Sequence, residues 1–168
     1  LLDVKVVALA NTVGRESAAS AQQTLLNPTT KAKYVSVGRH LASGNINSMA
    51  YSVDDGLSWT SIANDIFTDY GSGVHHSSKL SRWVAVGQGT NSIAHSTNGI
   101  IWTPVTNSTA IFSGSGRGVA YSAELSRWVA VGGGTNNNIA HSTDGITWVG
   151  LGTNHFTGGG GLGVFYSA

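Results

Sequence analysis

Residues 81–87, SRWVAVG, return unchanged at residues 126–132, which is 45 positions later. The segment IAHSTNG at 93–99 returns as IAHSTDG at 139–145, and the pair Gly-Val recurs at 73–74, 118–119 and 163–164. A more diverged copy, YVSVG at 34–38 followed by MAYS at 49–52, precedes these segments. A fixed period of this length is the sequence signature of a repeat architecture such as a solenoid or a propeller.

Each repeat predicts four short strands, which in the clearest copy cover residues 118–122, 128–132, 138–142 and 146–149. The second of them is apolar on both faces, with Val129 and Val131 on one side and Trp128 and Ala130 on the other. Such a strand needs cover on both sides, and a blade packed between two other blades has that cover. The sequence therefore predicts an all-β fold, a β-propeller built from four-stranded blades of about 45 residues.

The number of predicted strands amounts to about three blades plus one strand, whereas closed propellers have roughly four to eight blades. We therefore expect a partial ring that belongs to a longer protein, or a ring that copies of the chain complete, since a head-to-tail pair would hold six blades. Residues 4–10 (VKVVALA) are a candidate for the missing first strand, and 16–26 predict a short helix or a linker. The expected divisions are an N-terminal strand plus insertion or linker at 1–33, blades at 34–72, 73–117 and 118–162, and the first strand of a further blade at 163–168. The glycine-rich residues 113–116 and 158–161 are expected to connect blades.

The turn between the third and fourth strands holds Asn-Gly or Asp-Gly in the last two copies. These pairs favour the type I′ hairpin, in which both central residues take positive φ. We expect the serine before each pair to bond the turn backbone, and the tryptophan three residues after each glycine to fold back and become buried. The residues are Ser96, Asn98, Gly99 and Trp102 in one copy, and Ser142, Asp144, Gly145 and Trp148 in the other.

Residues 52–59, SVDDGLSW, match the Asp-box pattern Ser-x-Asp-x-Gly-x-x-Trp of the BNR repeat family through Ser52, Asp54, Gly56 and Trp59. Residues 96–102 and 142–148 resemble the same box with one residue deleted before the glycine. The resemblance covers the chain from about residue 34 to its end, and the repeats also look like repeat proteins of large algal viruses and phages. It implies a sialidase-like propeller in which the box lies on the outer rim and has a structural role.

Composition excludes several classes of function. The 168 residues include 10% charged residues and have a net charge of +1, without a cluster of Lys and Arg that would predict nucleic-acid binding. Cysteine is absent, which excludes disulfides and thiolate metal sites. No apolar run reaches the roughly 20 residues of a membrane helix. We expect no cofactor, no metal and no membrane insertion.

Polar Gly-Thr-Asn loops between the second and third strands, and a histidine in the third strand, recur at equivalent positions. Repeated loops on one face favour weak multivalent binding, for example to a glycan, while simple hairpin chemistry and repeat ancestry are the alternative explanation. The candidate ligand-facing residues are Gly89, Thr90, Asn91, His95, Gly134, Thr135, Asn136 and His141.

A catalytic set is not apparent in the sequence. Arg82 and Arg127 recur at one register, whereas a sialidase-like site needs arginines that converge on a substrate carboxylate. The glutamates are Glu16 and Glu124, and we find no acid/base pair. The expected function is therefore a non-catalytic binding or scaffolding module, a virion or cell-surface component that recognises a glycan or a protein and associates with other copies of itself or with a larger assembly. The alternative is a fragment of a sialidase-like glycoside hydrolase whose other blades carry the catalytic groups.

Overall fold

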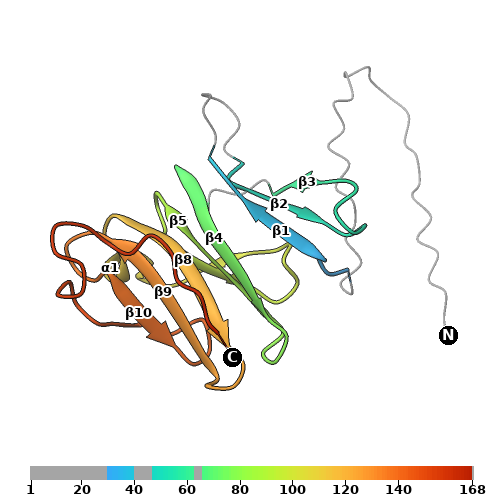
Figure 1. Cartoon of the computed structure of the whole chain (residues 1–168). Coiled ribbons are helices and arrows are strands. Elements are labelled where there is room, and N and C mark those ends of the chain that lie inside the picture. The colour runs from blue at the N-terminus through green and yellow to red at the C-terminus, as the bar shows by residue number, and fades with distance from the viewer. Residues whose placement is uncertain (1–29, 40–46, 63–65, 168) are drawn as a thin grey trace, which may run out of the picture.

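A computed structural model describes residues 30–39, 47–62 and 66–167 (Figure 1). The predicted strand at 4–10 and the predicted helix or linker at 16–26 lie outside these residues. The described chain forms three antiparallel sheets, which confirms the all-β prediction. Sheet A holds β1 (Tyr34–Val37), β2 (Met49–Ser52) and β3 (Thr60–Ser61). Sheet B holds β4 (Tyr70–Ser77), β5 (Arg82–Gln88), β6 (Ile93–Ser96) and β7 (Thr103–Pro104). Sheet C holds β8 (Ser115–Ser122), β9 (Arg127–Gly133), β10 (Ile139–Ser142) and β11 (Val149–Gly150), and the short helix α1 (Ser108–Ile111) precedes it.

The sheets share one pairing register because they share one repeat. Val74 lies opposite Ala85 in sheet B, and Val119 lies opposite Ala130 in sheet C. Each first strand starts earlier than predicted, with a register shift between its first two glycines. The glycine-rich residues 115–116 therefore belong to β8 and are not a connection between sheets.

The fourth strand is shorter than predicted, because β11 covers Val149–Gly150 and not residues 146–149. The cause is the preceding turn. The N–H groups of Ile146 and Thr147 donate to Asp144 Oδ1 at 2.7 and 2.8 Å, so they do not join the sheet.

The sheets stack face to face, with sheet B between sheets A and C (Figure 1). The central strand β5 serves both junctions, since Ala85 packs toward sheet A while Val84 and Val86 pack toward sheet C, and all three are fully buried. This is the two-sided cover that the apolar second strand required. The three sheets do not close into a ring within the described residues.

The sheets come closest where glycines of a first strand face the sheet before it. A Cβ on Gly116 would lie 2.7 Å from Val86 Cβ and 2.6 Å from the Ser92 carbonyl oxygen. A Cβ on Gly71 would likewise lie 2.8 Å from Val37 Cβ and 2.9 Å from the Ser48 carbonyl oxygen. Both junctions therefore have the same geometry and the same need for glycine.

Candidate functional site

The Asp-box hairpins are held by one serine and one carboxylate or amide. Ser142 Oγ accepts hydrogen bonds from the N–H groups of Gly145 (2.8 Å) and Asp144 (3.2 Å). Asn98 plays the part of Asp144 in sheet B, where its Oδ1 accepts the N–H groups of Ile100 and Ile101, both at 2.9 Å. The serine contacts are as predicted. Because an amide does the work of the carboxylate, the role of this side chain is to accept hydrogen bonds.

The turn type was predicted wrongly for the two shortened boxes. Gly99 and Gly145 have φ of 74° and 77°, but Asn98 and Asp144 are not among the described residues with positive φ. A type I′ turn needs positive φ at both central positions. Here Oδ1 of Asn98 or Asp144 accepts the N–H groups of the residues two and three positions later, which forms an Asx-type turn. In this turn the Asn or Asp does not need positive φ.

The box tryptophans differ in burial between sheets. Trp102 and Trp148 fold back as predicted and are 6% and 8% exposed. Trp102 Nε1 donates to the Gly99 carbonyl at 3.2 Å. Trp59 Nε1 donates to the Gly56 carbonyl in the same way, at 3.1 Å, yet Trp59 remains 48% exposed. The described part of the chain places no sheet in front of sheet A to cover this ring.

The box carboxylates are anionic at neutral pH. Hydrogen bonds from the Ser58 hydroxyl and N–H and from the Ser52 hydroxyl lower the pKa of Asp54 to about 2. Burial works to raise the pKa of Asp144, but the N–H groups of Thr147 and Ile146 outweigh it and the pKa lies below 3.8. Neither group is suited to donate a proton near neutral pH.

The Gly-Thr-Asn loops use much of their polarity to hold the connections between sheets. The N–H groups of Thr90 and Thr135 donate to Thr68 Oγ1 (3.0 Å) and Ser113 Oγ (2.8 Å). Asn91 Nδ2 donates to the Ile66 carbonyl at 3.0 Å. The matching contact in sheet C, to the Ile111 carbonyl at 2.9 Å, comes from Asn137. Repeat comparison aligns Asn136 with Asn91, but Asn136 Nδ2 donates to the Ala110 carbonyl at 3.1 Å. The shift arises because the loop in sheet C is one residue longer than the loop in sheet B. The loop glycines Gly89 and Gly134 have φ of 127° and 134°.

The repeated histidines lie apart from these loops. His95 and His141 stand in β6 and β10, opposite Val84 and Val129 in the sheets. His95 Nδ1 is 3.2 Å from Arg82 Nη1, and since a guanidinium can only donate, the neutral ring carries its proton on Nε2. Burial, and then the charge of Arg82, lower the pKa of His95, so the ring is neutral near pH 7. The described residues hold no group of three or more metal-ligating side chains.

A polar hollow at the junction of sheets A and B was missed by the sequence analysis. It has a volume of about 230 Å³ and is lined by Arg39, Thr68, Asp69, Tyr70 and Gln88. Arg39 Cζ lies 5.8 Å from the centre of the Tyr70 ring, and Gln88 Nε2 donates to Asp69 Oδ2 at 3.1 Å. Gln88 directly precedes Gly89, so the hollow opens at the end of the sheets that carries the Gly-Thr-Asn loops.

The repeats differ in chemistry at this hollow. At the junction of sheets B and C, Gln88 stands in the place of Arg39, and the positions 45 residues after Thr68, Asp69, Tyr70 and Gln88 hold small residues. They are Ser113, Gly114, Ser115 and Gly133. The cation, the carboxylate and the aromatic ring are therefore found together at one junction and are not a property of the repeat.

One tyrosine–glutamate pair lies at the opposite end of the sheets. Tyr166 Oη donates to Glu124 Oε2 at 2.6 Å, and both side chains are exposed. Arg127 and Tyr166 line the same small apolar hollow on sheet C. This contact between an acid and a phenol was not predicted, since residue 166 was expected only to form a strand.

No family model and no curated protein matches the chain. Among the residues that the structure describes, no helix is long and apolar enough to cross a membrane.

Proposed function

We propose that the protein is a non-catalytic, propeller-type binding and scaffolding module that recognises a saccharide at the hollow between sheets A and B. The observation that carries the proposal is the placement of Arg39, Asp69, Tyr70 and Gln88 around one hollow in a framework that otherwise repeats. Side chains that a repeat shares are explained by the fold. The polar residues of this hollow occur together at one junction, so the repeated fold does not explain them.

The chemistry of the hollow fits a sugar. Arg39 offers donors, Asp69 offers acceptors and Gln88 offers both, which together can pair with a ring of hydroxyl groups. Tyr70 adds an aromatic surface against which the apolar face of a sugar can lie. A concave site with a few convergent polar groups is the usual form of a small-molecule site.

The architecture is proposed on two grounds. The first is the stacking of three sheets through identical glycine junctions. The second is the resemblance of residues 52–59 to the Asp box of the BNR repeat family, which implies a propeller fold. A virion or cell-surface setting, with a glycan or a glycosylated protein as the partner, follows from the same resemblance and from the proposed ligand.

A glycan array printed with neutral and sialylated oligosaccharides, followed by calorimetry with the best binder, tests the function. Arg39→Ala should weaken binding by roughly 10-fold or more, because a lost hydrogen bond to a charged group costs about 1.5–3 kcal/mol. Asn136→Ala, in an exposed loop of sheet C, is the matched control and should bind as the original chain does. Absence of saccharide binding, or an equal loss in both variants, would contradict the proposal.

The Tyr166–Glu124 contact is the one observation that favours a glycoside hydrolase, because a tyrosine activated by a glutamate is the nucleophile of sialidases. Turnover of a sialoside that Tyr166→Phe abolishes would replace a binding function by this activity. We expect no turnover.

A further inference from the structure

Two strands of the repeat lack a partner in the described chain, and they are complementary. β1 is the second strand of its repeat, yet it forms the edge of sheet A, where a first strand would lie. Residues 161–167 read GLGVFYS and repeat the first-strand pattern G-x-G-V-x-x-S of residues 71–77 and 116–122. They pair with no strand among the described residues.

Residues 161–167 already occupy the place of a first strand on the outer face of sheet C. A Cβ on Gly161 would lie 2.5 Å from Val131 Cβ, just as one on Gly116 would lie 2.7 Å from Val86 Cβ. Val164 and Tyr166 line a hollow on sheet C together with Val129. Phe165 also borders this hollow, yet its side chain is 95% exposed.

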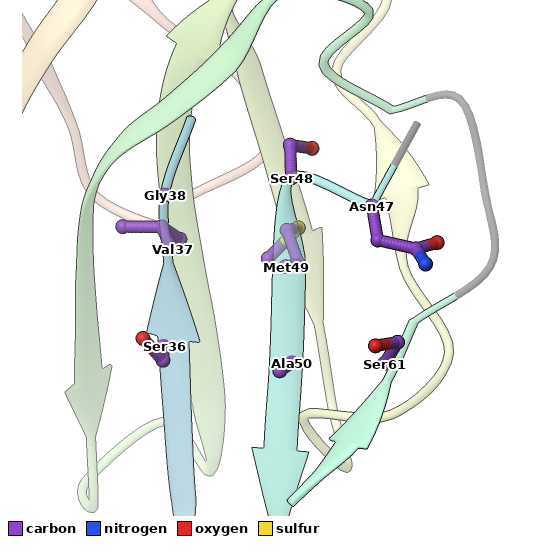
Figure 2. A pocket seen from close by; sticks show the side chains of 8 residues that line it. All are labelled: Ser36, Val37, Gly38, Asn47, Ser48, Met49, Ala50 and Ser61. Atoms are coloured by element: carbon purple, nitrogen blue, oxygen red, sulfur yellow. The ribbon is translucent and has the colours of Figure 1, made fainter. Parts of the chain in front are cut away.

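The outer face of sheet A is an uncovered copy of a face that is buried elsewhere. Tyr34 and Trp59 are 51% and 48% exposed, whereas Trp128 and Trp148 at the equivalent positions of sheet C are 0% and 8% exposed. Ser36 and Ala50 lie side by side on this face and help to line a shallow hollow of about 160 Å³ (Figure 2). Their equivalents in sheet C, the buried pair Ala130 and Ala140, pack in one cluster with Val84 and Val86 of sheet B. In sheet C the residues equivalent to those two valines are Val129 and Val131.

The two tryptophans of the second strands show what the missing strand would cover. Trp128 is fully buried, and His75, from the first strand of the sheet before it, lies edge-on to its ring at 6.0 Å between centroids. Trp83 is the equivalent ring in sheet B and is only half-buried. A first strand in sheet A with the sequence of residues 161–167 would bring Phe165 to the position of His75, against Trp83.

We propose that residues 161–167 of one copy pair with β1 of a second copy, in the antiparallel register of sheets B and C. Val164 then lies opposite Ser36, and Phe165 lies opposite Val35, as Val74 and His75 lie opposite Ala85 and Val84. The inference rests on the propeller architecture proposed above and names the second copy as the partner. Sheet A of that copy then stacks on sheet C of the first.

Charge supports this junction. At the junction of sheets B and C, Arg82 and His95 of sheet B lie close enough to Asp144 of sheet C for its charge to act on the pKa of His95. The equivalent residues of sheet C are Arg127 and His141. The new junction would set them beside Asp54, which is anionic above pH of about 2.

The copy number follows from the sheet count. The described residues of each copy form three sheets, so a ring built from them holds a multiple of three. Closed propellers have roughly four to eight blades, and six is the one multiple in that range. The contact is head-to-tail, and such contacts end when the ring closes. The proposed assembly is therefore a pair.

Cysteine pairing tests the register directly, because the chain contains no cysteine of its own. Two single variants, Ser36→Cys and Val164→Cys, are mixed under mild oxidation. Directly opposite side chains have Cβ atoms about 4.5–5.5 Å apart, near disulfide range. We expect a covalent pair that contains one chain of each variant. The matched control, Ser36→Cys mixed with Phe165→Cys, should link far less, since in the proposed paired strand neighbouring side chains point to opposite faces.

Light scattering on the cysteine-free chain provides the second measurement. The original chain should have twice the mass of one copy, and Phe165→Asp should have the mass of one copy while its circular dichroism is unchanged, because this side chain is 95% exposed in a single copy. Equal masses for the two chains would overturn the proposal. So would a ladder of larger species, which indicates an open filament, or absence of cross-linking, which indicates that another segment such as residues 4–10 occupies the edge of β1.

The two proposals fail separately. Cross-linking without saccharide binding overturns the ligand and keeps the pairing. Saccharide binding by a single-copy species overturns the pairing and keeps the hollow between sheets A and B.

Discussion

A methyl group at Gly132 has no space in this fold, whereas one at its neighbour Gly133 does. A Cβ on Gly132 would contact the Ser115 carbonyl oxygen and would lie 2.9 Å from Cγ and Cδ1 of Phe112. A Cβ on Gly133 would meet the end of the flexible Arg117 side chain at 3.0 Å. The first contact involves the paired strand β8 and a fully buried ring, and neither can move freely.

We therefore predict that Gly132→Ala lowers the free energy of unfolding by about 1–3 kcal/mol, the usual cost of overpacking a core. Gly133→Ala should stay within about 0.5 kcal/mol, as substitutions away from such contacts do. For a domain of this size each kcal/mol corresponds to roughly 2–4 °C in Tm. Gly132→Ala should then melt roughly 2–12 °C lower.

Urea titration followed by circular dichroism measures both variants on the same scale, with the midpoint reporting stability when the slope is unchanged. Gly87→Ala provides a second instance, because its Cβ would contact the Tyr70 carbonyl oxygen and lie 2.6 Å from Phe67 Cγ. Equal midpoints for Gly132→Ala and Gly133→Ala would refute the reasoning.

Two further predictions concern the Asp-box hairpins. Trp102→Ala should cost about 3–5 kcal/mol in urea titration, whereas Ile101→Ala, at a side chain that is 66% exposed, should cost far less; similar losses would mean that the ring is not a core residue. Asp144→Asn should flatten the pH dependence of stability: a lowered pKa stabilises the fold above the ordinary value of 3.8 and this contribution is lost as pH falls through the folded pKa. Urea midpoints at pH 7 and across the acid range measure this, and the variant should remain folded because Asn98 fills the same role in sheet B; an unchanged acid dependence would contradict it.

The sequence was sufficient to predict the sheets because the repeat carries redundant information. Each strand is short, but every copy of WVAVG and IAHS has the same neighbours, so an error in one copy is corrected by the others. Local details were less predictable. The fourth strand lost residues 146–148 to the turn, because a single side-chain oxygen of Asp144 competes with a strand for two N–H groups.

Close packing of glycine was also beyond the sequence. Residues 113–116 and 158–161 resemble flexible connections in composition, yet Gly116 and Gly161 each lie against a valine of the preceding sheet. Their recurrence at a spacing of 45, together with Gly71, was the available signal. The recurrence of Phe67 and Phe112, both fully buried, was a second such signal.

The hollow between sheets A and B could not be found by comparing repeats. Its residues come from three separate segments, at 39, 68–70 and 88, which become neighbours only when the two sheets stack. Repeat comparison shows which residues the copies share. A site made of residues that the copies do not share is invisible to it, and a structure is needed to bring those residues together.

The proposed pairing and the proposed ligand site reinforce each other. In a head-to-tail ring every copy has the same orientation along the ring axis, so both hollows between sheets A and B open on the same face. A surface that displays many saccharides can then engage both at once, and linked sites raise the overall affinity without any new contact. A single copy with one shallow polar hollow of about 230 Å³ offers few contacts to its ligand. Closing the ring would therefore hold two weak sites rigidly on one face, so that together they bind a multivalent ligand more tightly than either site alone.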